Sequence, residues 1–260
     1  MTRENLVTLA RHGSVAVVSL NSPQTKNALG GAISAELHRA LSEVAVDRQV
    51  RVVILTGGGG AFSSGADIRE GLPENRRVED VINHRYRPGL ELITGMDKPV
   101  IAAIAGPAAG IGLSFALACD LVVMGESAYL LSPFAAIGLI PDGGATWFLA
   151  RQLGYHRAYQ LCIEAEKIPA SQCLSAGLAN RVVPDHRLMD ESLEWASRLA
   201  ELAPLALART KWAMRQAMNL SLGETMALEA KLQNDCQTST DAAEGVRAFF
   251  EKRPPKFKGR

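Results

Sequence analysis

Residues 99–119 read PVIAAIAGPAAGIGLSFALAC and carry no charged side chain over 21 positions. An apolar helix of this length would be long enough to span a bilayer. Glycine and proline interrupt the stretch between residues 106 and 112, however, and both residue types break a continuous helix. We therefore expect two buried elements joined by a glycine turn: a strand at Val100–Ala105 and a short helix near Gly112–Ala118.

The sequence on both sides of this stretch alternates between strand and helix patterns. Two apolar runs flank the turn at residues 11–14, which predicts a hairpin of Leu6–Ala10 with Val15–Leu20. Further strands are expected at Val50–Leu55, Leu121–Met124 and Val182–Val183, with a small one at Tyr129–Leu131. Ile33, Leu37, Leu41 and Val44 recur at helical spacing and predict the first helix. This alternation is typical of an α/β fold with parallel strands and right-handed crossovers.

The later part of the chain is mostly helical. Residues 69 to about 83 carry charges without a clear period, and a helix is expected from there to about Met96. The final helices are expected at about 187–202, 205–219, 221–238 and 240–251, with breaks at Pro204 and near Gly223. We therefore divide the chain into a core of residues 1–203 and a helical C-terminal region of residues 204–260.

Composition excludes several classes of function. The 260 residues include 28 Lys and Arg against 27 Asp and Glu, and this balance argues against a nucleic-acid-binding protein. The four cysteines form no C-x-x-C pair and have no histidine at ligand spacing, so neither a disulfide framework nor a metal site is expected. No signal peptide is recognisable near the start, and we expect a cytoplasmic protein that does not associate with membranes.

The first of three glycine loops, residues 56–68, reads TGGGGAFSSGADI and directly follows a strand. It lacks the Gly-Lys-Ser/Thr end of a phosphate-binding P-loop, and its glycines do not open a helix at once as a dinucleotide fingerprint requires. It is either a flexible surface loop or a turn anchored by Phe62 and Ile68, in which Gly65 lets the backbone approach another group closely.

The other two loops are open to two interpretations each. Residues 105–114, AGPAAGIGLS, lead into a helix whose free N–H groups would suit a negatively charged oxygen, although small residues there also permit tight packing. Residues 140–147, IPDGGATW, place Asp142 between a proline and two glycines. Asp142 is either a helix N-cap or a carboxylate held at the wall of a pocket.

Several blocks of the chain, in order, resemble the crotonase superfamily, the enoyl-CoA hydratase/isomerase fold. The matching blocks are Asn27–Leu29, Phe62–Ile68, Ile101–Gly112, Ile137–Gly144 and Ala170–Val183. The resemblance implies an α/β fold with a ββα-spiral core and a helical C-terminal region that builds a homotrimer or a dimer of trimers. It also implies an acyl-CoA thioester ligand, with no cofactor apart from the coenzyme A of that substrate.

The resemblance also implies roles for individual residues. The family's oxyanion hole, made of two backbone N–H groups, falls on Ala66 and Ile111. Hydratases of the family place two glutamates in the pocket, and these positions are Ser114 and Phe134 here. Since hydration needs an acid and a base, the chain resembles more closely the isomerases that use the aspartate of a Pro-Asp-x-Gly pattern, which is Asp142.

Further contacts to the acyl group or to coenzyme A are expected from the same loops. An apolar wall of aromatic residues would desolvate Asp142 and raise its pKa, and cations would meet the phosphates of coenzyme A. The predicted binding residues are Lys26, Ala28, Ser64, Gly65, Asp67, Ile68, Gly110, Ser114, Phe134, Trp147 and Lys256. Asp67 is also suited to bracing its loop, and Lys256 lies in a basic tail that could equally be solvated or reach a neighbouring subunit.

These observations leave four functions to compare. The first is an acyl-CoA isomerase, in which Asp142 moves a proton along the acyl chain while the two N–H groups bind the thioester oxygen. The second is an atypical enoyl-CoA hydratase in which Asp142 alone directs water. The others are an acyl-CoA hydrolase or dehalogenase-like enzyme with Asp142 as nucleophile, and an acyl-CoA-binding scaffold without activity.

Overall fold

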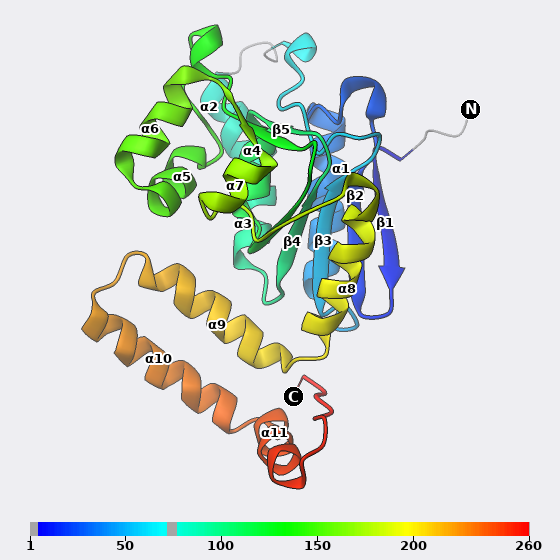
Figure 1. Ribbon diagram of the computed structural model, residues 1–260, viewed down its shortest axis with the longest axis vertical. Helices are drawn as coiled ribbons and strands as arrows, with labels where there is room; N and C mark the ends of the chain where they lie inside the picture. Colours follow the sequence, from blue (N-terminus) through cyan, green and yellow to red (C-terminus); the bar gives the residue numbers. More distant parts are fainter. Residues whose placement is uncertain (1–4, 72–76, 260) are drawn as a thin grey trace.

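A sheet of six strands runs through the part of the chain that our computed structural model describes, residues 5–71 and 77–259 (Figure 1). Its strands are β1 (Val7–His12), β2 (Val15–Leu20), β3 (Val52–Gly57), β4 (Val100–Ile104), β6 (Leu121–Gly125) and β9 (Arg181–Val183), in that spatial order. β1 and β2 form the predicted antiparallel hairpin, and every later neighbour pairs in parallel. The predicted α/β class is therefore confirmed.

Helices cover both faces of this sheet, which explains why β3 and β4 are apolar throughout. Val53 and Leu55 pack with the helices of one face, whereas Val52 and Ile54 pack against the helix of the other. Strands buried on both faces carry continuous apolar runs instead of alternating ones. The helices of the first face are α1 (Gly31–Val46), α3 (Arg87–Gly95) and α4 (Ile111–Ala118), and α8 (Leu188–Ala200) covers the second.

The apolar stretch of residues 99–119 folds as β4, a second short strand and α4, so it does not form one long helix. Within the described residues, no helix combines the length and the apolar character needed to cross a membrane. The second strand, β5 (Pro107–Ala109), belongs to a small sheet with β7 (Tyr129–Leu131) and β8 (Lys167–Pro169). We predicted only β7 of these three, because β5 and β8 are three-residue strands that each contain a proline.

The helix before β4 begins earlier than expected. It comprises α2 (Val78–Val81), a π-helical turn at Ile82–Tyr86 and α3, so the helical conformation starts within the segment that showed no period. Pro88 follows the π turn and supplies no N–H for a regular helical hydrogen bond, which favours the wider turn. Residues 72–76 of the same segment lie outside the described residues.

The remaining helices follow the predicted order. They are α5 (Ala145–Leu153), α6 (Tyr155–Glu164), α7 (Ala170–Ser175), α9 (Pro204–Ala217), α10 (Leu222–Gln237) and α11 (Thr240–Glu251). Single turns of 3₁₀ helix occur at Pro23–Thr25, Ile68–Glu70, Ala135–Ile137 and Asp185–Arg187. Figure 1 shows α9, α10 and α11 beside the core at one end of the molecule.

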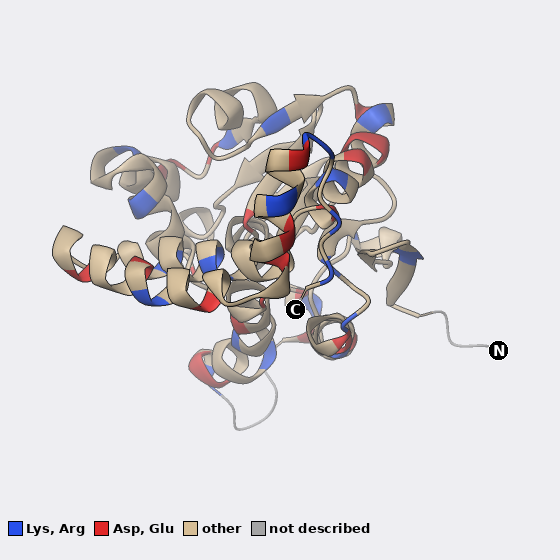
Figure 2. Cartoon of the chain, turned by 90° about the horizontal axis from the view of Figure 1, so that it is seen from below, with Lys and Arg blue, Asp and Glu red and all other residues tan. Residues whose placement is uncertain are grey.

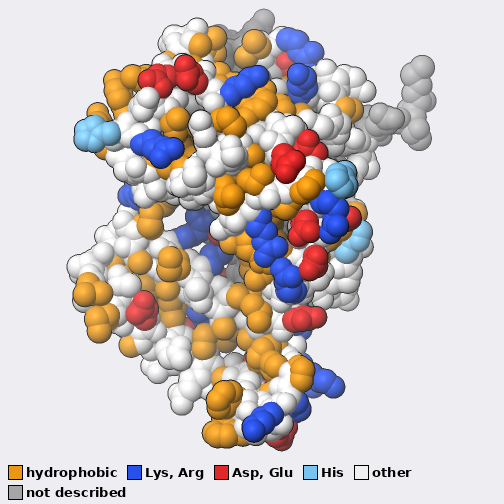
Figure 3. Space-filling view, in the orientation of Figure 1, with side chains coloured by type: hydrophobic (Ala, Val, Ile, Leu, Met, Phe, Trp, Pro, Cys, Tyr) orange, Lys and Arg blue, Asp and Glu red, His pale blue; other side chains and the backbone are white. Residues whose placement is uncertain are grey.

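The C-terminal helices expose many large apolar side chains. They include Trp212, Met214, Met218, Leu222, Met226, Val246, Phe249 and Phe250, and Figure 3 shows hydrophobic side chains spread over this part of the surface. Exposed apolar area of this kind often marks contacts between proteins. The assignment of residues 204–260 to oligomerisation stays a prediction.

A buried ionic cluster attaches α9 to the core. Asp120, which follows α4, lies 2.8 Å from both Lys211 Nζ and Arg215 Nη2. Lys211 also donates to the carbonyls of Ile93 and Lys98, at 2.8 and 3.0 Å. Burial lowers the pKa of Lys211, and the Asp120 charge opposes that shift. Asp120 therefore neutralises a lysine whose side chain is only 9% exposed.

We expect Asp120→Ala to lower the free energy of unfolding by about 2–4 kcal/mol, because it leaves the buried Lys211 ammonium without its counter-ion. The matched control is Glu194→Ala, which breaks an exposed ion pair with Arg198 on α8 and should cost less than about 0.5 kcal/mol. Urea denaturation of both variants provides the measurement. Equal losses in the two would mean that the cluster contributes no more than a surface pair.

Candidate active site

The loops that follow β3 and β4 lie side by side. Phe62 N–H donates to the Ala105 carbonyl at 2.7 Å, and Ser63 N–H donates to the Pro107 carbonyl at 3.0 Å. In return, Ala109 N–H donates to the Ser63 carbonyl at 2.9 Å. Because parallel neighbours end at the same edge of a sheet, these hydrogen bonds continue the pairing of β3 and β4 beyond the strands.

The two loops touch at Gly65 and Gly110. Gly65 has a φ of +104°, and a side chain there would place its Cβ 3.0 Å from the Ala109 carbonyl oxygen and 3.5 Å from Gly110 Cα. Gly110 has a φ of +55°, which also favours glycine. The close approach that we expected of Gly65 is therefore an approach to the second glycine loop.

Two backbone N–H groups come together at this contact. Ile111 is the first residue of α4, so its N–H has no acceptor within the helix, and Ala66 directly follows Gly65. Among the residues that the structure describes, neither N–H has a hydrogen-bond acceptor. The geometry thus offers two adjacent donors to an external oxygen, with the positive end of α4 at one of them.

Asp142 does not cap a helix. α5 begins at Ala145, its N-cap is Gly144, and no side chain caps it. The Asp142 main-chain carbonyl accepts hydrogen bonds from Ala145 N–H at 3.1 Å and from the Ser114 hydroxyl at 2.7 Å. The capping alternative is therefore wrong, and Ser114 holds the backbone of Asp142 against α4.

The turn after Asp142 packs directly on the first turn of α4. Gly143 has a φ of +60°, and a Cβ there would clash with the Ile111 side chain and lie 2.9 Å from Ser114 Cβ. Asp142 and Gly143 therefore both contact the helix that carries the Ile111 N–H, Asp142 through its carbonyl and Gly143 through its backbone. The third glycine loop thus joins the other two at one place.

The Asp142 carboxylate is half-buried, and one of its two oxygens is buried without a partner. Its Oδ1 atom is inaccessible to water and has no hydrogen-bond partner in the described part of the chain. Burial raises the pKa of Asp142 from its ordinary value of 3.8 to about 6, with a smaller opposing effect from its own backbone N–H. Residues 5–71 and 77–259 bring together no group of three or more His, Cys, Asp or Glu side chains that could hold a metal ion.

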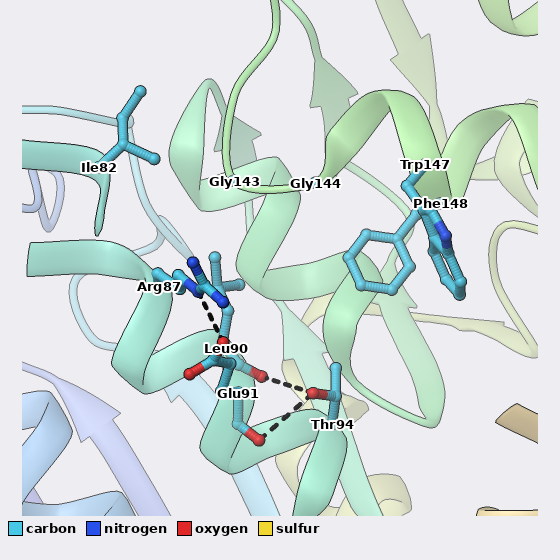
Figure 4. A pocket seen from close by; sticks show the side chains of 9 residues that line it. All are labelled: Ile82, Arg87, Leu90, Glu91, Thr94, Gly143, Gly144, Trp147 and Phe148. Carbon is cyan, nitrogen blue, oxygen red and sulfur yellow. Dashed lines mark hydrogen bonds and ion pairs between the residues drawn. The ribbon is translucent and has the colours of Figure 1, made fainter. Parts of the chain in front are cut away.

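A cavity of about 280 Å³ starts beside Asp142, at Gly143 and Gly144 (Figure 4). Ile82, Leu90, Trp147 and Phe148 give it apolar walls, while Arg87, Glu91 and Thr94 line it from α3. Trp147 thus lines a cavity that begins one residue beyond Asp142, and its contact with an acyl group stays a prediction. Phe134 is not part of this wall, since its ring packs 3.9 Å from the Cβ position of Gly110 and supports the second glycine loop.

The segment before α1 braces the first glycine loop. Ser64 N–H donates to the Lys26 carbonyl, and the Ser64 hydroxyl donates to the Thr25 carbonyl, both at 2.8 Å. Lys26 is exposed, and Ala28 is buried behind it. The structure thus places Lys26, Ala28 and Ser64 next to the two N–H groups, where their predicted contacts with coenzyme A stay predictions.

Asp67 braces the first glycine loop, as we expected, whereas Ile68 does not anchor it. Asp67 accepts the backbone N–H of Arg69 and pairs with its guanidinium at 2.7 Å, which lowers the pKa of Asp67 and braces the loop. Phe62 is fully buried, but the Ile68 side chain is 81% exposed. Our prediction that Ile68 anchors the loop is therefore wrong, and its side chain is free to touch a ligand.

Lys256 lies at the opposite end of the sheet in the same chain. Arg51, which precedes β3, donates to the carbonyl of Phe257 at 2.9 Å, whereas Ala66 lies beyond the other end of β3. A six-residue strand separates these ends by about 20 Å. Figure 2 shows Lys and Arg residues along the coil that ends at the C-terminus. Lys256 therefore does not join the site of its own chain.

Three residues important for the site escaped sequence analysis. Buried Asn27 donates from its side chain to the carbonyls of Gly58 and Ala61, at 2.9 and 2.7 Å. The Tyr86 hydroxyl donates to the Leu29 carbonyl at 3.0 Å, and Glu70 accepts the Gly31 N–H at the start of α1. Asn27 stood within a matching block, but only its buried position reveals that it holds the loop.

Comparisons with known proteins identify the family of the chain. The chain matches the family described as enoyl-CoA hydratase/isomerase over residues 10–260. A Rhodobacter capsulatus protein named "Probable enoyl-CoA hydratase" is 42% identical over 253 residues, which cover 95% of each sequence. The 2,3-dehydroadipyl-CoA hydratase of Escherichia coli is 35% identical and covers 97% of this chain and 98% of its own.

Solved structures share the whole fold. The crystal structure of enoyl-CoA hydratase from Bacillus anthracis superposes with a TM-score of 0.93 at 33% identity, covering 98% of this chain and all of that one. One from Geobacillus kaustophilus gives 0.92 at 34% identity over 98% of both chains. The chain therefore belongs to the crotonase superfamily, within the enoyl-CoA hydratase/isomerase family.

Proposed function

We propose that the protein isomerises acyl-CoA thioesters, moving the double bond of a 3-enoyl-CoA to the 2-position. The observation that carries the proposal is the half-buried carboxylate of Asp142, whose Oδ1 atom has no hydrogen-bond partner among the described residues, close to the Ala66 and Ile111 N–H groups, which have no acceptor there. The thioester oxygen accepts hydrogen bonds from Ala66 and Ile111, and the acyl chain continues into the cavity past Trp147.

The reaction uses one residue as base and then as acid. The Asp142 carboxylate removes a proton from C2, and the electrons of the C–H bond form a dienolate whose oxygen carries the charge. The protonated Asp142 then returns the proton to C4, which leaves the double bond between C2 and C3. One oxyanion-hole donor is worth about 2.7–4 kcal/mol in the transition state, and acid–base catalysis about 10²–10⁴-fold in rate.

Ser114 and Phe134 support isomerisation over hydration. They occupy the positions where the resemblance implies the two glutamates of a hydratase, and neither side chain is an acid or a base at neutral pH. Ser114 is instead used to hold the Asp142 backbone at 2.7 Å. Isomerisation needs only one carboxylate, whereas hydration needs a base for water and an acid for C2.

A hydratase is the second candidate, because the relatives and structures above are named enoyl-CoA hydratases. In that case Asp142 alone would direct water to C3. A thioester hydrolase and a binding protein without activity complete the alternatives. Coenzyme A is part of the substrate in each case, with Lys26 near its phosphates and a homotrimer or a dimer of trimers as the expected assembly.

We expect the wild-type protein to exchange deuterium into C2 and C4 of a 3-enoyl-CoA in deuterated water, since Asp142 moves a proton between them. Asp142→Asn should slow the exchange at least about 10²-fold, because an amide cannot act as the base. The control is Asp190→Asn, an exposed aspartate on α8. Mass spectrometry of the recovered thioester measures the label.

Other products would contradict the proposal. Accumulation of 3-hydroxyacyl-CoA would show hydration, and release of free coenzyme A would show hydrolysis. Tight binding without exchange would indicate an acyl-CoA-binding protein without activity. Equal exchange in wild type and Asp142→Asn would remove Asp142 from the mechanism.

The exchange rate should depend on pH through Asp142. The base must be ionised, so kcat/KM should rise with pH, reach half its plateau near pH 6 and stay level above pH 7. The midpoint is measured from a profile of kcat/KM against pH, with a substrate whose acyl chain carries no ionisable group. A midpoint below pH 4.5 would mean that the carboxylate is solvated in the working enzyme.

Asp142→Asn should also stabilise the fold. Above pH 6 the carboxylate is charged in both states, but only the folded state buries it, as its raised pKa shows. The rise of the pKa from 3.8 to about 6 corresponds to at most about 3 kcal/mol, and the partial exposure of Asp142 reduces this figure, so the variant should gain about 2 kcal/mol at pH 8. The gain should shrink as the pH falls from 6 to 4, and a gain that does not change with pH would contradict the explanation.

A further inference from the structure

The cavity that begins at Gly143 and Gly144, next to Asp142 in the sequence, has one polar wall. Ile82, Trp147 and Phe148 line it with apolar groups, whereas α3 contributes Arg87 and Glu91 on neighbouring turns (Figure 4). An aliphatic chain suits the apolar walls. The charged pair lies along the same space, so a bound acyl group would meet both.

The hydrogen bonds of this wall involve only some of its polar atoms. The Thr94 hydroxyl is satisfied by the Leu90 carbonyl at 3.0 Å. Arg87 Nε donates to Glu91 Oε1 at 2.6 Å, but the two terminal nitrogens of Arg87 have no acceptor within residues 5–71 and 77–259. Glu91 thus fixes the guanidinium by one edge and leaves its other donors open.

A guanidinium held in this way is suited to a second carboxylate. Its terminal N–H groups form a planar fork that matches two carboxylate oxygens. The Arg87 and Glu91 side chains are 63% and 61% exposed, so a charged ligand group could reach them without complete loss of water. A hydrocarbon end in the same place would displace water from the ion pair and make no hydrogen bond in return.

We propose that the preferred substrate is the CoA thioester of a dicarboxylic acid, whose free carboxylate binds the terminal nitrogens of Arg87. The proposal rests on the proposed function, because the acyl group must enter the cavity from the thioester site. The methylene segment contacts Trp147 and Phe148, and Arg87 recognises the end remote from the sulfur.

Binding of unreactive ligands tests this preference apart from catalysis. The probes are two saturated CoA thioesters of equal carbon number, one ending in a methyl group and one in a carboxylate, compared by isothermal titration calorimetry. We expect the carboxylate-ended thioester to bind wild type about tenfold more tightly, as for a charge-assisted hydrogen bond at a partly exposed site. Since both carry the same coenzyme A, contacts to its phosphates cancel.

Two substitutions and a matched control locate the effect. Arg87→Met keeps the apolar length, and should weaken binding of the carboxylate-ended thioester about tenfold while changing the methyl-ended one less than about twofold. Glu91→Gln should increase the preference, because it removes a competing carboxylate. Arg198→Met breaks a comparable exposed pair with Glu194 on α8 and should change neither affinity.

The outcomes separate this proposal from the proposed function. Equal affinities of wild type for the two thioesters, or an equal loss of both in Arg87→Met, would overturn the assignment of Arg87. Either result can occur while deuterium exchange proceeds normally with a methyl-ended substrate. Conversely, a tenfold preference that Arg87→Met abolishes would support the assignment even if no exchange were observed. Failure of both thioesters to bind would overturn both proposals.

Discussion

The contact between the backbones at Gly65 and Gly110 is the constraint on which the site depends. Parallel pairing of β3 with β4 brings the two following loops to one edge of the sheet, and their hydrogen bonds continue the pairing. Both positions favour glycine because their φ values are positive, +104° at Gly65 and +55° at Gly110, and a Cβ on Gly65 would lie only 3.0 Å from the Ala109 carbonyl oxygen. Ala66 and Ile111 follow these glycines, so the same contact that closes the loops also presents two N–H groups to a ligand.

The proposed reaction also requires a carboxyl group whose hydrogen bonds the fold leaves incomplete, and this group is Asp142. Burying Asp142 Oδ1 without a partner destabilises the folded protein when the carboxylate is charged, and the fold offsets this elsewhere. The benefit is chemical: a pKa of about 6 leaves the group ionised at neutral pH and yet more basic than a solvated aspartate. Gly143 and Ser114 position it, since the first packs on α4 and the second donates to the Asp142 carbonyl.

Much of this arrangement could be predicted from local sequence. Continuous apolar runs marked β3 and β4, the stripe from Ile33 to Val44 marked α1, and the glycine loops pointed to Gly65, Gly110 and Asp142. Contacts distant in sequence could not be predicted. Asn27, Tyr86 and Glu70 contact backbone groups that lie 31 to 57 positions away in the sequence. Ile68 is apolar and was expected to anchor its loop, but its side chain is 81% exposed. The position of Lys256 at the opposite end of the sheet could not be predicted either, because a basic tail has no pattern that indicates which end of the sheet it follows.

The most direct test is a crystal structure of Asp142→Asn with a bound 3-enoyl-CoA. We predict the thioester oxygen at about 2.7–3.1 Å from the N–H nitrogens of both Ala66 and Ile111. C2 and C4 should both lie about 3–3.5 Å from the side chain of residue 142, the range of a reactive geometry. A thioester oxygen bound elsewhere, or a side chain at position 142 turned away from C2, would contradict the account.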